Sequence, residues 1–488
     1  MTRTRTRQAP LSSYSDGSRA GHPRTAGIRR RWARLQEAVS TQLWPTPLAA
    51  IFIAVVAGIL LPLLDARVDE ELPESIRVLL FNGGPDSARA VLSTIAGSLI
   101  TATSLTFSLT VLALQLASSQ ASPRLLRMFS SDSMVHATLA TFLATFAFSL
   151  LVLRTVQNST DSTAAAVPSI SITVCILLTL ASVVMLTVFL AHLAKQLRVE
   201  TMLLRVHRET RRTLVLVEST TPDGPEVIPA GTRPTTVNTV LAERSGFLTS
   251  ASRRAVVALA SRFDIVVEEE HSLGSSVISG VPLVSWWSRS DTVPTDAHGE
   301  ELDHDAFERT VRSAYPTTYE RTSSQDIGFG LRQLVDIAVR ALSPGVNDPT
   351  TAVHALSHVS AVLCRIAKLP PQPAGLLDND GELRLIVRPH SFSNLLNLGM
   401  EQPRRYGASD PQVVARLFLM LREVALNTED SGRLASIAMQ RSRLIASIAE
   451  EDFDPIERAT FVELIEAVDA ALAREAVVDE VDAALAEK

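Results

Sequence analysis

The sequence predicts an all-α transmembrane region of four helices, followed by a cytoplasmic α+β region with a small β-rich barrel or sandwich and then a helical domain. Three observations support this. The chain contains four long runs without charged residues, its basic residues gather at particular ends of those runs, and strand-like alternation later gives way to helical periodicity. With 488 residues, of which 46% are hydrophobic and 20% charged, the chain is too long for one ordinary domain.

The four runs predict membrane-spanning helices because none contains Asp, Glu, Lys or Arg. Even the shortest run reaches about 25 Å as a helix, which is enough to cross a bilayer with little tilt. We therefore expect contact with the lipid bilayer along a transmembrane domain over residues 45–196. Its spans are about 48–64, 91–119, 135–153 and 169–193.

The positions of arginine and lysine predict the orientation of these spans. Basic residues are concentrated before the first span, between spans two and three and after span four, whereas the other two connections are acidic or nearly neutral. Because positively charged flanks stay on the cytoplasmic side, both termini should be cytoplasmic. An alanine-rich composition that uses arginine in place of lysine indicates a bacterial source. We therefore expect a multi-pass protein of the bacterial inner (plasma) membrane, with residues 1–44 as a basic, disordered tail.

Small and polar residues in the second span recur on one helix face, at spacings of 4, 3, 4, 7 and 4. In lipid, such a face turns toward protein or water. It could line a hydrated pathway around an oligomer axis. It could also be a packing face, because small residues let membrane helices approach closely. The residues concerned are Gly97, Thr101, Ser104, Ser108, Gln115 and Ser119.

Beyond the last span the pattern of the sequence changes several times. Residues 197–232 combine a charged helical continuation with a segment rich in Pro and Gly, and they predict a helical stalk and a linker. Residues 233–290 alternate short apolar strands with glycine turns, which predicts the small β-rich domain. Residues 300–475 return to helical periodicity, and residues 476–488 form an acidic C-terminal tail.

The dipeptide Asp-Pro occurs three times ahead of a helical pattern, beginning at Asp348, Asp410 and Asp454. Aspartate is a strong N-cap because its carboxylate accepts hydrogen bonds from the free backbone N–H groups of the first turn. Proline suits the first helical position and favours an extended conformation for the residue before it. We therefore expect these three aspartates to be structural helix caps.

Two longer stretches resemble a known family. They are "SLTFSLTVLALQLASSQASPRLLRMF", in the second span and the loop after it, and "QDIGFGLRQLVDIAVRALSPGVNDPTTA" in the helical domain. Both are similar to sequences of the bacterial predicted membrane proteins of domain-of-unknown-function family 2254. The resemblance extends from about the first span to Leu472. It implies an inner-membrane protein with four spans and a cytoplasmic region, and it brings no catalytic residues.

Few side chains form a pattern typical of a site. His354 and His358 have the i, i+4 spacing of a metal pair, but no third ligand is evident in the sequence, so we expect no metal. Arg388, Arg404 and Arg405 lie close together in the sequence and form either an anion-binding patch or a solvated face. No catalytic motif or nucleotide-binding loop occurs. We therefore expect no enzyme activity and no cofactor, and a net charge of −6 favours no nucleic-acid partner.

These patterns favour a homo-oligomeric channel or permease-like assembly with a cytoplasmic regulatory region. The polar face of the second span is the observation that supports it. A membrane-anchored sensor or scaffold without transport activity is the alternative, because the same face would also serve helix packing. The residues do not identify a permeant ion or a ligand.

Overall fold

The structure is a computed structural model of the whole chain. It describes residues 44–68, 73, 80–120, 132–156, 167–220, 224–229, 232–290, 293–296, 298–322 and 325–486. The chain divides into two compact units. The first, here called the four-helix unit, comprises Met1–Val111 and Arg127–Leu190, and the second, the mixed unit, comprises Leu112–Leu126 and Ala191–Lys488. The predicted N-terminal tail lies outside the described residues, except for Trp44.

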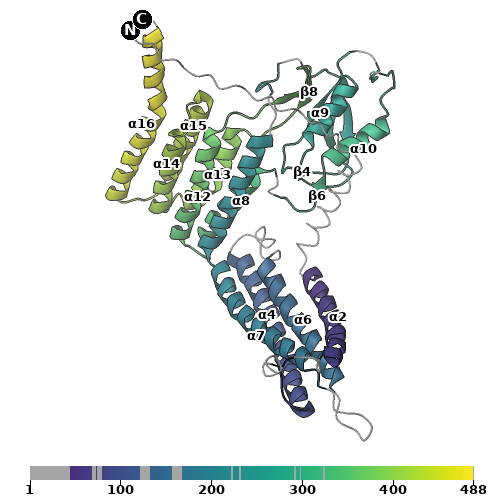
Figure 1. Cartoon of the computed structure of the whole chain (residues 1–488). Coiled ribbons are helices and arrows are strands. Elements are labelled where there is room, and N and C mark those ends of the chain that lie inside the picture. The colour runs from purple at the N-terminus through teal and green to yellow at the C-terminus, as the bar shows by residue number, and fades with distance from the viewer. Residues whose placement is uncertain are drawn as a thin grey trace, which may run out of the picture. The chain divides into compact units, whose positions relative to one another are not determined.

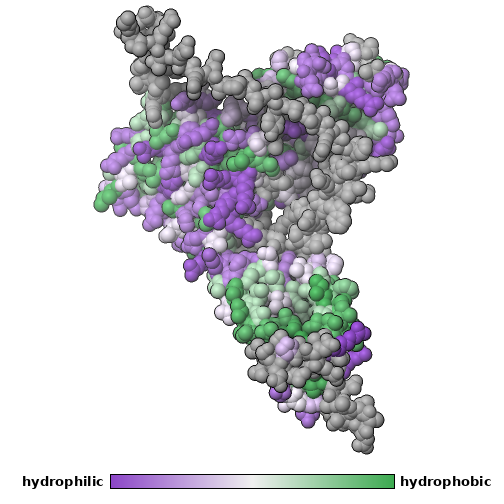
Figure 2. Space-filling view, viewed as in Figure 1, coloured by the Kyte–Doolittle hydropathy of each residue, from purple (hydrophilic) through white to green (hydrophobic). Residues whose placement is uncertain are grey.

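The four predicted spans are confirmed as four helices that are long and apolar enough to cross a membrane. Each is longer than its uncharged run, because the helix continues into polar residues at one or both ends. Figure 2 shows hydrophobic side chains gathered on the visible surface of these helices. The helices are α2 (Pro45–Val68), α4 (Pro85–Gln120), α6 (Ser133–Thr155) and α7 (Ser169–Gln196) (Figure 1).

Helix α6 supplies much of the core of the four-helix unit. Its most apolar stretch is 56% buried, compared with 17–22% for the other three spans. Phe142, Phe148 and Val152 of α6 pack in one cluster with Leu92 of α4 and Ile172 of α7. The other spans therefore leave much of their surface free to meet lipid or protein.

A carboxylate from one span caps the start of another. Asp65, near the end of α2, is 3% exposed. Its oxygens accept hydrogen bonds from the backbone N–H groups of Ile170 and Ser171, at 3.0 and 2.8 Å, and from the Ser171 hydroxyl at 2.7 Å. The first turn of α7 has free N–H groups and a partial positive charge, and Asp65 satisfies both. The first and fourth spans are thus joined at one end.

The strands of the mixed unit form two sheets, and no closed barrel is seen among the described residues. The predicted β-rich domain is therefore confirmed in having strands, whereas its description as a small barrel or sandwich is confirmed only in part. The five-stranded sheet has the order β1-β5-β3-β8-β7, in which β3 and β8 are parallel and the other pairs antiparallel. The second sheet has the order β4-β2-β6. The strands are β1 (Asn238–Leu241), β2 (Gly246–Leu248), β3 (Ile265–Glu269), β4 (Ser276–Val277), β5 (Pro282–Ser288), β6 (Thr317–Thr318), β7 (Gly375–Leu377) and β8 (Leu383–Ile386).

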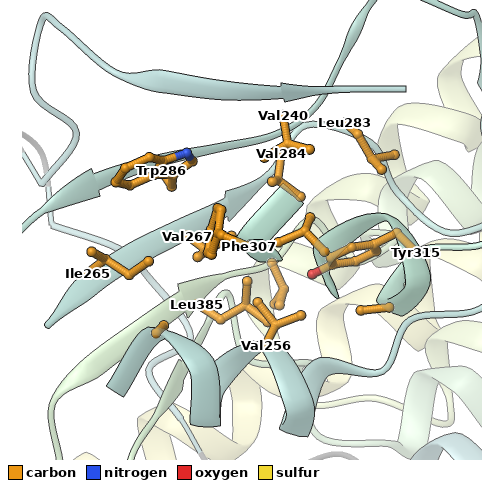
Figure 3. Close-up of a cluster of buried hydrophobic side chains, with 14 of the residues drawn as sticks. Val240, Val256, Ile265, Val267, Leu283, Val284, Trp286, Phe307, Tyr315 and Leu385 are labelled. Carbon is orange, nitrogen blue, oxygen red and sulfur yellow. The ribbon is translucent and has the colours of Figure 1, made fainter. Parts of the chain in front are cut away.

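The last two strands of the five-stranded sheet come from a hairpin that is distant in the sequence. Strand β8 pairs with β3, with Leu385 opposite Val267. Part of the predicted helical domain, residues 300–475, therefore completes the sheet. Two helices, α9 (Arg253–Arg262) and α10 (His304–Ala314), contribute to the same core. Figure 3 shows Val256 of α9 and Phe307 of α10 packed among the buried strand residues.

The remaining helices of the mixed unit pack against one another, and most of them are labelled in Figure 1. Helix α8 follows α7 directly in the chain and packs against α11 and α12. A Cβ atom at Gly330 of α11 would lie 2.1 Å from the Thr210 hydroxyl oxygen of α8, so this close approach requires glycine. Helix α16 extends into the predicted acidic tail. These helices are α8 (Val199–Thr220), α11 (Ile327–Ala341), α12 (Pro349–Lys368), α13 (Phe392–Gly407), α14 (Pro411–Ala425), α15 (Ser431–Ile448) and α16 (Pro455–Ala486).

The three Asp-Pro positions lie at helix starts. The Asp348 carboxylate accepts from the Thr351 N–H at 3.0 Å, and Asp410 accepts from Val413 at the same distance. Asp454 accepts from the N–H of the third residue after it at 2.8 Å. Asn347 has a φ of 48°, a left-handed conformation that asparagine tolerates, and it completes the turn before α12. The segment between α11 and α12 is thus a capped turn.

Candidate functional site: the exposed face of α4

The polar residues predicted on the second span lie on the exposed face of α4. Gly97, Thr101, Ser104, Ser108 and Gln115 are all exposed in the chain. Ser119 belongs to the same helix, but its side chain lies outside the described residues. At 3.6 residues per turn, the five described positions fall within one narrow stripe along the helix. This stripe is called the polar stripe below.

The opposite face of α4 is the one that packs into the protein. Leu92, Ile95 and Leu99 are buried in the core of the four-helix unit, and the first of them is fully inaccessible. Thr106 and Ala113 continue this buried face, at 0% and 3% exposure. The apolar side of α4 is thus turned inward and its most polar side outward.

Large apolar residues border the polar stripe on both sides. Each border repeats at steps of seven and then four residues, so it runs parallel to the stripe. One border consists of Ile100, Phe107 and Val111, and the other of Leu105, Leu112 and Leu116, all of them exposed. The outward half of α4 therefore has a narrow polar centre between two apolar margins.

The other two exposed spans show the contrast. The exposed large residues of α2 include Phe52, Ile59 and Leu63, and those of α7 include Leu180 and Val184. These are surfaces that lipid tails solvate well, since nothing polar has to be desolvated. Among the exposed span surfaces that the structure describes, α4 differs in presenting a hydroxyl stripe.

The hydroxyl groups of the stripe donate to their own helix. Thr101 donates to the carbonyl of Gly97 at 3.0 Å, and Ser108 to that of Ser104 at 2.9 Å. Such back-bonding satisfies the hydroxyl proton but leaves the oxygen lone pairs free to accept from water or a neighbouring helix. The stripe therefore suits either a hydrated surface or helix packing.

Two further residues extend the polar stripe toward the start of α4. Ser93 and Thr94 are exposed, and both hydroxyls donate to the Ala90 carbonyl, at 3.0 and 2.7 Å. They were not among the predicted residues, although Ser93 lies four residues before Gly97 and so on the same face. A Cβ atom at Gly97 would meet no atom within 4 Å. Another helix can therefore approach the α4 backbone closely at that point.

Of the three arginines expected to form either an anion-binding patch or a solvated face, Arg388 is engaged by carboxylates. Its guanidinium lies 3.1 Å from Glu268 and 3.2 Å from Glu270. Arg405 lies 3.5 Å from Glu401 in the same helix, whereas Arg404 donates to the Ser447 hydroxyl of α15. The structure therefore gives the three arginines different partners.

The histidine pair of α12 gains a third ring that sequence spacing could not indicate. His207 of α8 lies 5.1 Å from His358 between ring centroids, and His354 lies 5.3 Å from His358. Burial is the main cause that lowers the pKa of both His207 and His358. In the part of the chain that the structure describes, no group of three or more His, Cys, Asp or Glu side chains is arranged to hold a metal ion.

These features define a membrane protein with four apolar helices and a larger unit of mixed sheet and helix. The chain belongs to the family described as Predicted membrane protein (DUF2254), whose model matches residues 40–423. The resemblance expected from the two sequence stretches is thereby confirmed, although the matched region ends within α14 and before Leu472.

Related proteins are known by sequence. Uncharacterized proteins of Mycobacterium bovis and Mycobacterium tuberculosis are each 34% identical to this chain over 441 residues, which cover 89% of this chain and 81% of the relative. No solved structure matches the chain.

Proposed function

We propose that this protein forms a homo-oligomer in the bacterial inner membrane, in which the polar stripes of several α4 helices line a hydrated path for a small ion or solute. The observation that supports this is the reversed polarity of α4, whose apolar side is buried in its own chain and whose polar side is exposed. Lipid tails would gain nothing from that exposed side, since they offer no hydrogen-bond partners.

The apolar margins of the stripe support an arrangement around an axis. If several α4 helices pack by margins such as Phe107 and Leu105, the polar centre between the margins faces the axis. Residues 90–120 contain no charged side chain. A path lined in this way would offer hydroxyls, backbone carbonyls and the Gln115 amide to a permeant species, without a titratable relay.

The basic residues that flank the spans support a cytoplasmic position for both termini and for the mixed unit. In this proposal the mixed unit regulates the path and performs no catalysis of its own. Helix α8 begins three residues after α7 ends at Gln196 and packs against α11 and α12, so a change in the helical part of the mixed unit acts on a direct continuation of the fourth span.

The alternative function is a membrane-anchored sensor or scaffold that transports nothing. The back-bonded hydroxyls of Thr101 and Ser108 favour it, because a helix whose hydroxyls are satisfied internally can pack against another helix without water. Both functions predict an oligomer, so flux and not assembly distinguishes them.

The test is ion flux into proteoliposomes that contain the purified full-length protein. We expect Ser104→Leu with Ser108→Leu to abolish flux while the oligomer mass in detergent is unchanged. The matched control is Thr187→Leu on α7, which replaces an exposed threonine whose hydroxyl donates to Val183 four residues earlier at 3.1 Å. This control should conduct like the wild type.

Two results would contradict the proposal. A wild-type oligomer that conducts no ion under any gradient or voltage tested would favour the scaffold. Equal loss of flux in the α4 double variant and the α7 control would show that the loss does not depend on the polar stripe.

A further inference from the structure

Helices α13 and α15 of the mixed unit are joined by a polar contact that continues along their interface. The Asn397 side-chain oxygen of α13 accepts from Arg443 at 2.9 Å and from the Gln440 amide at 3.2 Å, both on α15. Glu401 lies one helical turn after Asn397 on α13, and Arg404 and Arg405 lie two turns after it. The Asn397 amide donates to Glu401 at 3.1 Å.

Arginines from both helices gather at this contact. Arg404 donates to the hydroxyl of Ser447, which lies one turn from Arg443 on α15. Burial, followed by the positive charges of Arg443 and Arg405, lowers the pKa of Arg404 below its ordinary value. The Arg404 Nε–H is enclosed and has no hydrogen-bond acceptor among the described residues. The positive charges are therefore close enough to repel one another.

The acidic residues described near this cluster do not neutralise it. Glu401 contacts Arg405 at 3.5 Å, and no carboxylate of the described residues lies within ion-pair distance of Arg404 or Arg443. Three guanidinium groups thus face one carboxylate, which leaves two positive charges. The neighbouring Arg441 differs, because it forms an ion pair with Asp469 of α16.

Three other inward-facing arginines of the mixed unit show the contrast, because carboxylates compensate their charges. Arg253 donates two hydrogen bonds to Glu269, at 2.8 and 2.9 Å. Arg416 donates two to Glu423, at 2.8 and 2.5 Å. Arg384 contacts two aspartates, at 2.6 and 2.7 Å. A half-buried guanidinium costs free energy unless a negative charge compensates it. At Arg404 and Arg443, neutral Ser and Asn side chains occupy the place of that charge.

We propose that Arg404 of α13 and Arg443 of α15, with Arg405 at the edge, bind a phosphate-type dianion between these two helices. A phosphate group carries close to the two negative charges that the cluster lacks. The planar guanidinium fork matches phosphate oxygens, and charge-assisted hydrogen bonds to it are strong. The phosphate could belong to a soluble ligand or to a lipid headgroup. The inference does not depend on whether the α4 stripe conducts.

The experiment uses full-length protein in detergent and follows thermal unfolding while inorganic phosphate is added, with chloride at equal ionic strength as the reference. We expect a saturable rise in the melting temperature with phosphate and no comparable rise with chloride. Arg404→Gln with Arg443→Gln should weaken the apparent phosphate affinity at least about tenfold. Arg309→Gln, an exposed position on α10, is the matched control and should bind like the wild type.

A second variant separates binding from folding. Glu401→Gln removes the one carboxylate that competes for these arginines, so phosphate should bind several-fold more tightly to it. A merely structural cluster would show no such gain. The Arg404 and Arg443 double variant should also be at least as stable as the wild type in chloride, because its like charges are gone.

The source of the phosphate is distinguished by a third arm. Nanodiscs of phosphatidic acid, whose phosphomonoester approaches two negative charges, and of phosphatidylcholine are compared for their effect on the melting temperature of the wild type and the double variant. Stabilisation by inorganic phosphate alone assigns a soluble ligand, and stabilisation by phosphatidic acid that the double variant loses assigns a lipid headgroup. If neither occurs, or if the double variant responds like the wild type, the proposal is wrong.

Discussion

Glu269 of β3 is the most enclosed acidic group of the sheet, and replacing it with glutamine tests whether a buried ion pair stabilises this sheet. Its side chain is 2% exposed. One carboxylate oxygen accepts from Arg253 at 2.8 Å and from the Tyr315 hydroxyl at 3.1 Å. The other accepts from Arg253 at 2.9 Å and from the Arg388 N–H at 3.3 Å. Each oxygen thus has two donors.

Glutamine keeps the shape of the side chain but removes its charge and places an N–H₂ group where an acceptor is needed. Arg253 would lose its counter-charge, and the adjacent Glu268 and Glu270 cannot replace it because Arg233 and Arg388 engage them. Breaking a buried ion pair costs about 3–5 kcal/mol. Because the Arg253 side chain is still 23% exposed, water offsets part of this loss, and we expect a cost near the lower limit, about 3 kcal/mol.

The assay is amide hydrogen exchange of β3 and β5 in the full-length protein, which reports the free energy of opening this sheet. Glu300→Gln is the matched control, since Glu300 is 74% exposed and lies 3.4 Å from Arg262. A surface pair of this kind contributes about 0–1 kcal/mol. If Glu269→Gln lowers protection no more than the control, the buried pair does not stabilise the sheet and the reasoning is refuted.

Two further predictions concern backbone conformation and pH. Gly274 and Gly280 have φ values of 81° and 84°, but a Cβ atom would lie 2.0 Å from an Asp326 oxygen at Gly274 and in open space at Gly280. Alanine should therefore cost about 1–2 kcal/mol of backbone strain at either position, with overpacking of about 1–3 kcal/mol more at Gly274. Equal losses in chemical denaturation would contradict this. The pKa values of His207 and His358 are lowered, so at mildly acidic pH the unfolded chain binds protons that the folded chain does not. The free energy of unfolding should therefore fall as the pH drops below 6.5, the ordinary pKa of histidine. It should level off once the pH is below the pKa values of the folded state. His358→Gln should flatten this slope in thermal unfolding from pH 7.5 to 5, and an unchanged slope would rule the histidines out.

The features that the sequence predicted well are those that depend on neighbouring residues. An uncharged run is long enough to cross a membrane whatever surrounds it, so the four helices were expected. The Asp348 carboxylate reaches an N–H three residues away, so a cap can be read from the local pattern. The spacing of the polar stripe likewise places its residues on one face of α4, but only packing shows that this face is turned outward.

The features that the sequence did not predict depend on contacts between distant segments. The pairing of β3 with β8 joins Val267 to Leu385, and no local signal in either strand indicates the other. This pairing brings a hairpin from the predicted helical domain into the sheet, which the strand pattern of residues 233–290 alone could not indicate. The positive cluster of α13 and α15 was only partly visible for the same reason. Arg404 and Arg405 were noted together, but Arg443 reaches them through a helix contact, and Arg388 pairs with carboxylates of the sheet.

The cap that Asp65 provides has a consequence for biogenesis. The aspartate is made with the first span, while the N–H groups that it serves arrive with the last, more than a hundred residues later. Until α7 inserts, the Asp65 carboxylate lacks these partners, so we expect the first span to be held firmly only once the fourth is in place. A chain shortened before Ser169 should therefore be a substrate for membrane proteases, because its first helix lacks the partner that secures it.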